Sequence, residues 1–348
     1  MVQIESFGKM TDGTQARRYT LENKSGMKAV LTDLGANLIE LWAPDRNGTL
    51  RDVVWGYADA LSYEHNPTGF GSTIGRNANR IGGAEVTIDE VPYPLEKNNN
   101  QVNNLHSGVR GYNKRMWQAK AGEESVVFTL LSPDGDQGFP GNAEVSVTYT
   151  LTDANELKIH YRATADRDTI FNLTNHSYFN LEGEESDSIL EQSVWIDADA
   201  MTPVADSFAI PTGEIRDIRG TAMDFTKPKP IGRDIDADYD QLQFGGGYDH
   251  NYVLNHPGAF RVVASMYAER TGIFMQVSTD LPGMQFYTAN FLDGEVGGKR
   301  GRVYGRRSAA CFETQYYPDA NHHANFPSTI VRAGEVYETE TAYSFSVK

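Results

Sequence analysis

The sequence predicts an all-β protein, a large antiparallel β-sandwich with few short helices. Apolar residues alternate with polar residues over short stretches along the whole chain, which is the pattern of half-buried strands. No stretch keeps the apolar spacing of an amphipathic helix for three turns. The 33 glycines and 14 prolines are spread throughout and mark the many turns that such a fold needs.

The first predicted strands cover residues 29–34, 38–42 and 53–55, with a turn at residues 45–48 before the third. That turn contains Asn-Gly between two apolar runs, which is a strong local signal for a hairpin. Residues 84–95 repeat the theme, because apolar and polar residues alternate on both sides of a short turn. The N-terminal part of the chain is therefore expected to form hairpins.

The clearest meander is predicted over residues 125–165, where the chain alternates, turns at residues 153–155 and alternates again. A further strand pair is expected at residues 261–268 and 273–279, and the chain ends in a strand at residues 336–347. In each case one face of the sheet is expected to be buried and the other exposed to water.

The predicted strands continue from one end of the chain to the other, with no linker, low-complexity tract or fixed-period repeat between them. We therefore expect one domain over residues 1–348. Hydrophobic residues make up 39% of the chain and aromatic residues 11%, which is enough for a large core.

The charge of the chain disfavours two classes of binding partner, and its cysteine content indicates a cellular compartment. The 47 acidic residues outnumber the 31 scattered basic ones, so we expect neither a nucleic acid nor an anionic membrane as a partner. The single cysteine, Cys311, excludes an intramolecular disulfide and a cysteine-based zinc site. Residues 1–8 lack the pattern of a signal peptide, and a reducing compartment fits the single cysteine. A cytoplasmic location is expected.

His176 lies within residues 171–181, a stretch in which aromatic and apolar residues flank amides and hydroxyls. The pKa of an imidazole suits proton transfer near neutral pH. The neighbouring Asn175, Ser177 and Asn180 are expected to fix the tautomer and orientation of the ring. A hydrogen-bonded core histidine is the plainer interpretation of the same pattern.

Two further polar segments are candidates for substrate binding. His106 lies in a glycine-bounded loop between polar residues, and loops often carry function. Arg76 and Arg80 flank a short amide-rich segment, and a guanidinium that faces a pocket would bind a polyol well. Spacing alone does not decide which arginine does so, and both can equally be surface cations of a polar turn.

Two carboxylates complete the set of candidates. Glu313 follows a small apolar run at residues 309–312, which is typical of a buried strand, and burial raises the pKa of a carboxyl group toward that of a useful base. A structural ion pair is the alternative. Asp249 follows three glycines at residues 245–247, but no helix pattern follows them, so a nucleotide site is disfavoured and a plain glycine-rich turn is the alternative.

No metal site is expected. His322 and His323 lie close to Asp319, which imitates a metal-binding cluster. Adjacent histidines on a loop rarely share one ion, however, and no third ligand has suitable spacing.

Several polar segments occur in one order along most of the chain, at residues 75–81, 104–108, 175–181, 248–251, 313–315, 318–319 and 325–327. Together they resemble the aldose 1-epimerase family, and within it the galactose mutarotases. The fold that this resemblance implies is the large mutarotase-like β-sandwich, in agreement with the predicted strands.

The resemblance also implies a role for each candidate. Glu313 resembles the general base that takes the proton of the C1 hydroxyl, and His176 resembles the general acid that protonates the ring oxygen. Arg76, His106 and Asp249 resemble residues that bind the sugar. Ring opening, rotation about C1–C2 and reclosure would interconvert the α and β anomers of galactose and glucose. No cofactor is expected, because one base and one acid suffice for these proton transfers.

Other functions stay open on the residues alone. A sugar-binding module without catalysis fits a β-sandwich with polar loops, and a glycoside hydrolase could use Asp249 and Glu313 as its carboxylate pair. The hydrolase would leave His176 without a role. An enzyme for phosphorylated hexoses would need extra cations near the pocket. The sequence does not rank the aldoses, and it leaves the oligomeric state open, with a homodimer as one candidate.

Overall fold

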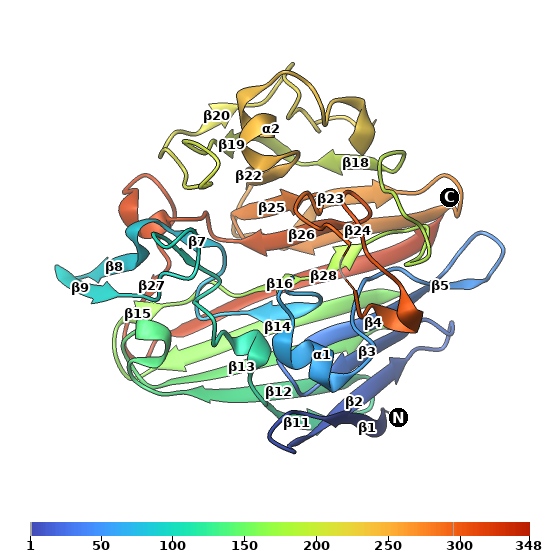
Figure 1. The fold of residues 1–348 in the computed structure, drawn as a ribbon, viewed down its shortest axis with the longest axis horizontal. Helices are drawn as coiled ribbons and strands as arrows, with labels where there is room; N and C mark the ends of the chain where they lie inside the picture. The colour runs from blue at the N-terminus through green and yellow to red at the C-terminus, as the bar shows by residue number, and fades with distance from the viewer. Residues whose placement is uncertain (1, 295) are drawn as a thin grey trace.

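A computed structural model of the chain describes residues 2–294 and 296–348. The fold is all-β, as predicted, and the strands run antiparallel in three main sheets (Figure 1). Within the described residues the only α-helices are α1 (Ala60–His65) and α2 (Asp240–Gly245). None of the helices in these ranges is long and apolar enough to cross a bilayer.

The largest sheet has nine strands and contains the predicted meander, the later strand pair and the C-terminal strand. In spatial order it consists of β11 (Gln118–Ala121), β12 (Ser125–Ser132), β13 (Ala143–Leu151), β14 (Glu156–Ala165), β28 (Val336–Val347), β24 (Ile273–Thr279), β23 (Arg261–Tyr267), β18 (Ser193–Ile196) and β21 (Lys229–Pro230).

Two smaller sheets complete the sandwich. The six-stranded sheet has the order β17 (Tyr178–Phe179), β26 (Ala310–Gln315), β25 (Gly283–Tyr287), β22 (Asp249–Leu254), β19 (Ala198–Thr202) and β20 (Arg216–Asp217). The five-stranded sheet consists of β1 (Gln3–Lys9), β2 (Gln15–Glu22), β3 (Lys28–Thr32), β4 (Asn37–Pro44) and β5 (Leu50–Asp52).

Four two-stranded pairs lie outside these three sheets in the described part of the chain. They are β6 (Ser72–Ile74) with β16 (Thr174–His176), β7 (Arg80–Ile81) with β10 (Asn104–Leu105), β8 (Glu85–Ile88) with β9 (Val91–Pro94), and β15 (Thr169–Ile170) with β27 (Ile330–Val331).

One buried apolar cluster joins all three sheets. It includes Val147 and Tyr161 of the nine-stranded sheet, Leu41 of the five-stranded sheet, and Phe286 and Phe312 of the six-stranded sheet. Along β13 every second residue is buried, as the predicted alternation requires. Burial of this apolar surface is the main driving force for packing the sheets against one another.

The predicted strand at residues 53–55 is wrong. The strand β5 ends at Asp52, and Val53 N–H still donates to Leu41 O of the five-stranded sheet. The chain then passes to the six-stranded sheet, where Val54 forms an isolated bridge with Phe179 and Trp55 N–H donates to Tyr178 O. The apolar run is buried because it crosses between two sheets, which the local pattern could not distinguish from a strand.

The strands β22, β25 and β26 bring polar residues together inside the six-stranded sheet. Gln285 of β25 lies opposite both Asn251 of β22 and Glu313 of β26. Every residue of β25 and β26 is buried, and β26 pairs on its other side with β17, where Cys311 lies opposite Tyr178. These polar side chains therefore lie on buried strands of this sheet.

Candidate active site

A cavity of about 450 Å³ lies over the six-stranded sheet. Polar side chains from strands and loops far apart in the sequence line it, namely Arg80, His106, His176, Asp249, Gln285 and Glu313. Tyr178 and Tyr287 add aromatic surface. A concave site with a few convergent polar groups is the usual form of a small-molecule site.

Glu313 is almost completely buried, with 1% of its surface exposed. Its Oε1 atom lies 3.5 Å from Nε2 of His176. Within the described part of the chain, its Oε2 atom has no hydrogen-bond partner. Burial, together with the negative charge of Asp249, raises the pKa of Glu313 well above its ordinary value. This carboxyl group is therefore tuned toward the basicity that a general base needs.

His176 ends the strand β16, and its ring is held from both sides. Nε2 faces Glu313, and Nδ1 lies 3.7 Å from Sγ of Cys311. Burial lowers the pKa of His176 to about 4. The backbone of His176 is fixed by Gly71, whose N–H donates to His176 O at 3.0 Å. Only glycine fits there, because φ is +64° and a Cβ would lie 1.8 Å from Leu38 O.

The pKa shifts of Glu313 and His176 run in opposite directions, and each favours the neutral form. Between these two pKa values the pair holds one exchangeable proton in total, which resides on Glu313 or on Nε2 of His176. Moving that proton from the carboxyl group to the imidazole produces a carboxylate base and an imidazolium acid side by side. The pair can thus donate one proton and accept another without any net change.

His106 is positioned as a neutral hydrogen-bond donor. The Asn79 N–H donates to its Nδ1 at 3.1 Å, so the proton of the neutral ring lies on Nε2. Burial, assisted by neighbouring His176, lowers the pKa of His106 well below its ordinary value. His106 and Ser107 both have left-handed backbone conformations, with φ of 51° and 66°, which is uncommon for residues other than glycine and concentrates at functional sites.

Asp249 lies at the start of β22, between an amide and a guanidinium. Its Oδ1 accepts a hydrogen bond from Gln285 Nε2 at 2.7 Å, and its Oδ2 lies 3.9 Å from Nη2 of Arg80. Among the described residues, Nε of Arg80 has no hydrogen-bond partner. A carboxylate and a guanidinium are therefore both available to hydroxyl groups of a bound ligand.

The same cluster has the composition of a metal site. His106, His176 and Glu313 each bring one ligand atom within 4.8 Å of the others. The hydrogen bond from Asn79 to His106 puts a proton on Nε2, so His106 presents a donor to the cavity rather than a lone pair. We therefore assign these side chains to proton transfer and hydrogen bonding, and the expected absence of a metal stays a prediction.

Comparison with known proteins places this site in a family. A family model described as aldose 1-epimerase matches residues 17–344. The chain belongs to the aldose 1-epimerase family. It is 40% identical over 342 residues to a galactose mutarotase of Sus scrofa, covering 98% of this chain and 97% of that protein. It is 38% identical over 339 residues to an aldose 1-epimerase of Escherichia coli K12, covering 96% of each.

Solved structures of aldose epimerases have the same fold. A GalM/aldose epimerase homologue from C. elegans superposes with a TM-score of 0.85 at 32% identity, covering 95% of this chain and 99% of that one. A galactose 1-epimerase from Lactobacillus acidophilus has a TM-score of 0.86 at 25% identity, covering 100% and 99%. The mutarotase-like sandwich expected from the sequence is therefore confirmed.

Four of the five predicted site residues of this epimerase line the cavity: His106, His176, Asp249 and Glu313. The expectation for Arg76 is wrong. Arg76 has no exposed surface, and its guanidinium donates to Pro140 O, Gly141 O, Thr169 Oγ1, Ser132 O, Ser132 Oγ and Tyr112 OH. A guanidinium so enclosed cannot contact a ligand in the cavity. Arg80 lines the cavity instead.

Because Arg76 is enclosed and Arg80 lines the cavity, we expect substitutions of the two arginines to have different effects. We expect Arg80→Gln to raise KM for the sugar by roughly tenfold or more, because a charge-assisted hydrogen bond to the ligand is lost, with little change in Tm. We expect Arg76→Gln to destabilise the fold by about 3 kcal/mol, because it leaves several buried carbonyl groups without a donor. Thermal unfolding and initial-rate kinetics on both variants check this, and a larger Tm loss for Arg80→Gln would contradict it.

The predicted support of the His176 ring by Asn175, Ser177 and Asn180 is also wrong. The Asn175 amide donates to Gly71 O and Tyr149 OH, and Ser177 Oγ donates to Asn175.

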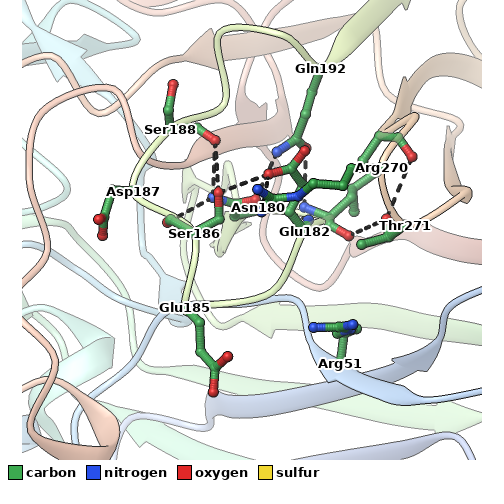
Figure 2. Close-up of polar contacts among 12 residues, drawn as sticks. Arg51, Asn180, Glu182, Glu185, Ser186, Asp187, Ser188, Gln192, Arg270 and Thr271 are labelled. Atoms are coloured by element: carbon green, nitrogen blue, oxygen red, sulfur yellow. Dashed lines mark hydrogen bonds and ion pairs between the residues drawn. The ribbon is translucent and has the colours of Figure 1, made fainter.

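Asn180 instead organises the following loop (Figure 2). Its amide donates to the carbonyl groups of Ser186 and Ser188, and its Oδ1 accepts from Gln192. These three residues around His176 therefore shape the backbone, whereas the two ring nitrogens face Sγ of Cys311 and Oε1 of Glu313.

Sequence reasoning missed Gln285 and Cys311. The strand that carries Gln285 is buried on both faces, so its residues show no alternation that would single out one side chain. A signal for Cys311 was present, because it precedes Glu313 by two residues on a strand and must share its face. The glycines at residues 245–247 end α2 rather than begin a helix, which agrees with the rejection of a nucleotide site.

Proposed function

We propose that the protein is an aldose 1-epimerase that interconverts the α and β anomers of galactose, and of glucose. The observation that carries this proposal is the Glu313–His176 pair. Oε1 of Glu313 and Nε2 of His176 lie 3.5 Å apart, and both side chains line the cavity of about 450 Å³. The names of the galactose mutarotases at about 40% identity support the choice of galactose.

In the proposed reaction the carboxylate of Glu313 takes the proton of the C1 hydroxyl, and Nε2 of protonated His176 gives a proton to the ring oxygen O5. The C1–O5 bond breaks as the C1–O1 bond gains double-bond character, which yields the open aldehyde. Rotation about C1–C2 presents the other face of the aldehyde, and the reverse transfers close the ring. Atoms and charges balance, because the sugar gains one proton and loses another.

Three other side chains would hold the sugar while it opens. His106 offers an N–H, Asp249 offers carboxylate oxygens, and Arg80 offers guanidinium donors. Tyr178 and Tyr287 give the cavity aromatic walls that suit the apolar face of a pyranose. If these side chains hold the rest of the opened sugar while C1 rotates, reclosure of the ring is favoured over release of the aldehyde.

Polarimetry of freshly dissolved α-galactose tests the proposal. We expect the protein to accelerate the approach to the equilibrium rotation far above the buffer rate. Galactose binding in calorimetry without acceleration would instead identify a sugar-binding module. Release of an aryl alcohol from an aryl galactoside would identify a glycoside hydrolase.

The paired pKa shifts predict a bell-shaped pH dependence of kcat/KM. Below about pH 4 both His176 and Glu313 are protonated. The pair then has no carboxylate that can take the C1 proton, so the rate falls. Above the raised pKa of Glu313 the pair loses its single proton, so the acid is lost. Rates should therefore be flat between the pKa of His176 and the raised pKa of Glu313, and fall on both sides. A profile that rises steadily with pH would contradict one-proton catalysis.

A role in carbohydrate metabolism follows from this proposed reaction. The cytoplasmic location and the homodimer stay predictions, which cell fractionation and light scattering can check.

A further inference from the structure

Strand β26 contacts both nitrogens of the His176 ring. Cys311 and Glu313 are two residues apart on this strand, so their side chains point to the same face. The sulfur of Cys311 lies 3.7 Å from Nδ1, and Oε1 of Glu313 lies 3.5 Å from Nε2. Any change at Cys311 therefore acts on the imidazole that faces Glu313.

The surroundings leave the sulfur as the side-chain partner of Nδ1. Cys311 is completely buried in an apolar cluster with Tyr178 and Tyr287. Burial, with the negative charges of Glu313 and Asp249, raises the pKa of the Cys311 thiol, so it remains uncharged. In the described part of the chain, no other side chain forms a hydrogen bond with Nδ1, and the backbone of His176 itself is a further hydrogen-bond partner of the imidazole.

The other titratable and charged groups near the His176 ring lie against its faces and edges or in the cavity, and not at Nδ1. His106 packs edge-on with a centroid separation of 5.3 Å, and the phenol rings of Tyr178 and Tyr287 lie at 5.1 and 6.3 Å. Asp249 and Arg80 lie in the same cavity. They set the charge around the ring, whereas the sulfur of Cys311 is the side-chain atom that contacts Nδ1.

Proton transfer with Glu313 requires a particular tautomer of neutral His176. If Nδ1 carries the proton, Nε2 has a free lone pair and accepts the proton of Glu313. If Nε2 carried the proton, the lone pair would lie on Nδ1, facing the sulfur, and the transfer would be blocked. The thiol of Cys311 can accept the Nδ1 hydrogen or donate to a lone pair on Nδ1, and proton transfer with Glu313 requires the first of these two arrangements. The same hydrogen bond persists in the imidazolium form, so only Nε2 changes its protonation during the cycle.

We infer that Cys311 is a positioning residue whose sulfur accepts the Nδ1 hydrogen of His176 and so keeps Nε2 as the nitrogen that exchanges protons. The kinetic consequence rests on the proposed function, whereas the tautomer is a property of the protein without substrate.

Three substitutions test the inference. Cys311→Ala and Cys311→Val remove the acceptor, the first with a loss of volume and the second with a gain. Cys311→Ser keeps an atom that can accept and donate. We expect kcat to fall roughly three- to tenfold in the Ala and Val variants, with KM unchanged, and to fall less in the Ser variant. Thermal unfolding shows which variants are folded.

The decisive measurement is NMR of protein with 15N-labelled histidine, where the His176 signals are those absent from His176→Asn. We expect the wild-type ring to carry its proton on Nδ1 and the Ala and Val variants to shift toward the Nε2-protonated tautomer. An unchanged tautomer in both folded variants would overturn the inference, as would a wild-type ring protonated on Nε2. These outcomes are independent of the activity, so a protein without epimerase activity would overturn the proposed function alone.

Discussion

Glu313→Gln is expected to lower kcat by at least about a hundredfold while leaving KM for galactose close to the wild-type value. Glutamine has nearly the same shape and can still form hydrogen bonds in the cavity, but its amide cannot accept the C1 proton. Binding and catalysis should therefore separate in this variant. Polarimetry gives the rate, and calorimetry with galactose gives the affinity.

The chain offers a matched control for this substitution. Glu338 also pairs with a histidine, because its Oε1 lies 2.8 Å from Nε2 of His160, but that pair is solvent-exposed. Glu338→Gln makes the same substitution at the same kind of contact with a histidine, and its kinetics should be unchanged. If Glu313→Gln retained near-normal polarimetric rates, the base would have to be assigned to another group.

His176→Asn is expected to lower kcat by roughly a hundred- to ten-thousandfold. The amide of asparagine cannot deliver a proton to O5, and the pair loses the site to which Glu313 passes its proton. Because the variant has no imidazole acid left to lose, the fall in rate at alkaline pH should also disappear, whereas the fall at low pH should remain since Glu313 must still be deprotonated. Polarimetric rates across the pH range measure both effects.

His160→Asn is the corresponding control, since it removes an exposed histidine from the Glu338 pair. A loss below tenfold in His176→Asn would reassign the acid, and His106 would be the next candidate because its ring lies against that of His176. The double variant Glu313→Gln/His176→Asn should be little worse than either single variant, because the two groups act as one unit.

The sequence alone determined the class of fold and the chemical identity of the site. Alternation between apolar and polar residues is a local property, and it predicted the meander over residues 125–165 and the C-terminal strand with the bounds that are observed. Local composition also singled out the segments that carry Glu313 and His176, because buried titratable residues are costly without a use.

Only the tertiary structure decided which side chains meet. Arg76 and Arg80 have similar neighbours in the sequence, yet one is enclosed by backbone carbonyl groups and the other faces the cavity. The contact between Cys311 and His176 joins residues 135 positions apart. Such contacts depend on strand order and register across the sheets, which arise from packing of the whole core and leave no trace in the local pattern around any one residue.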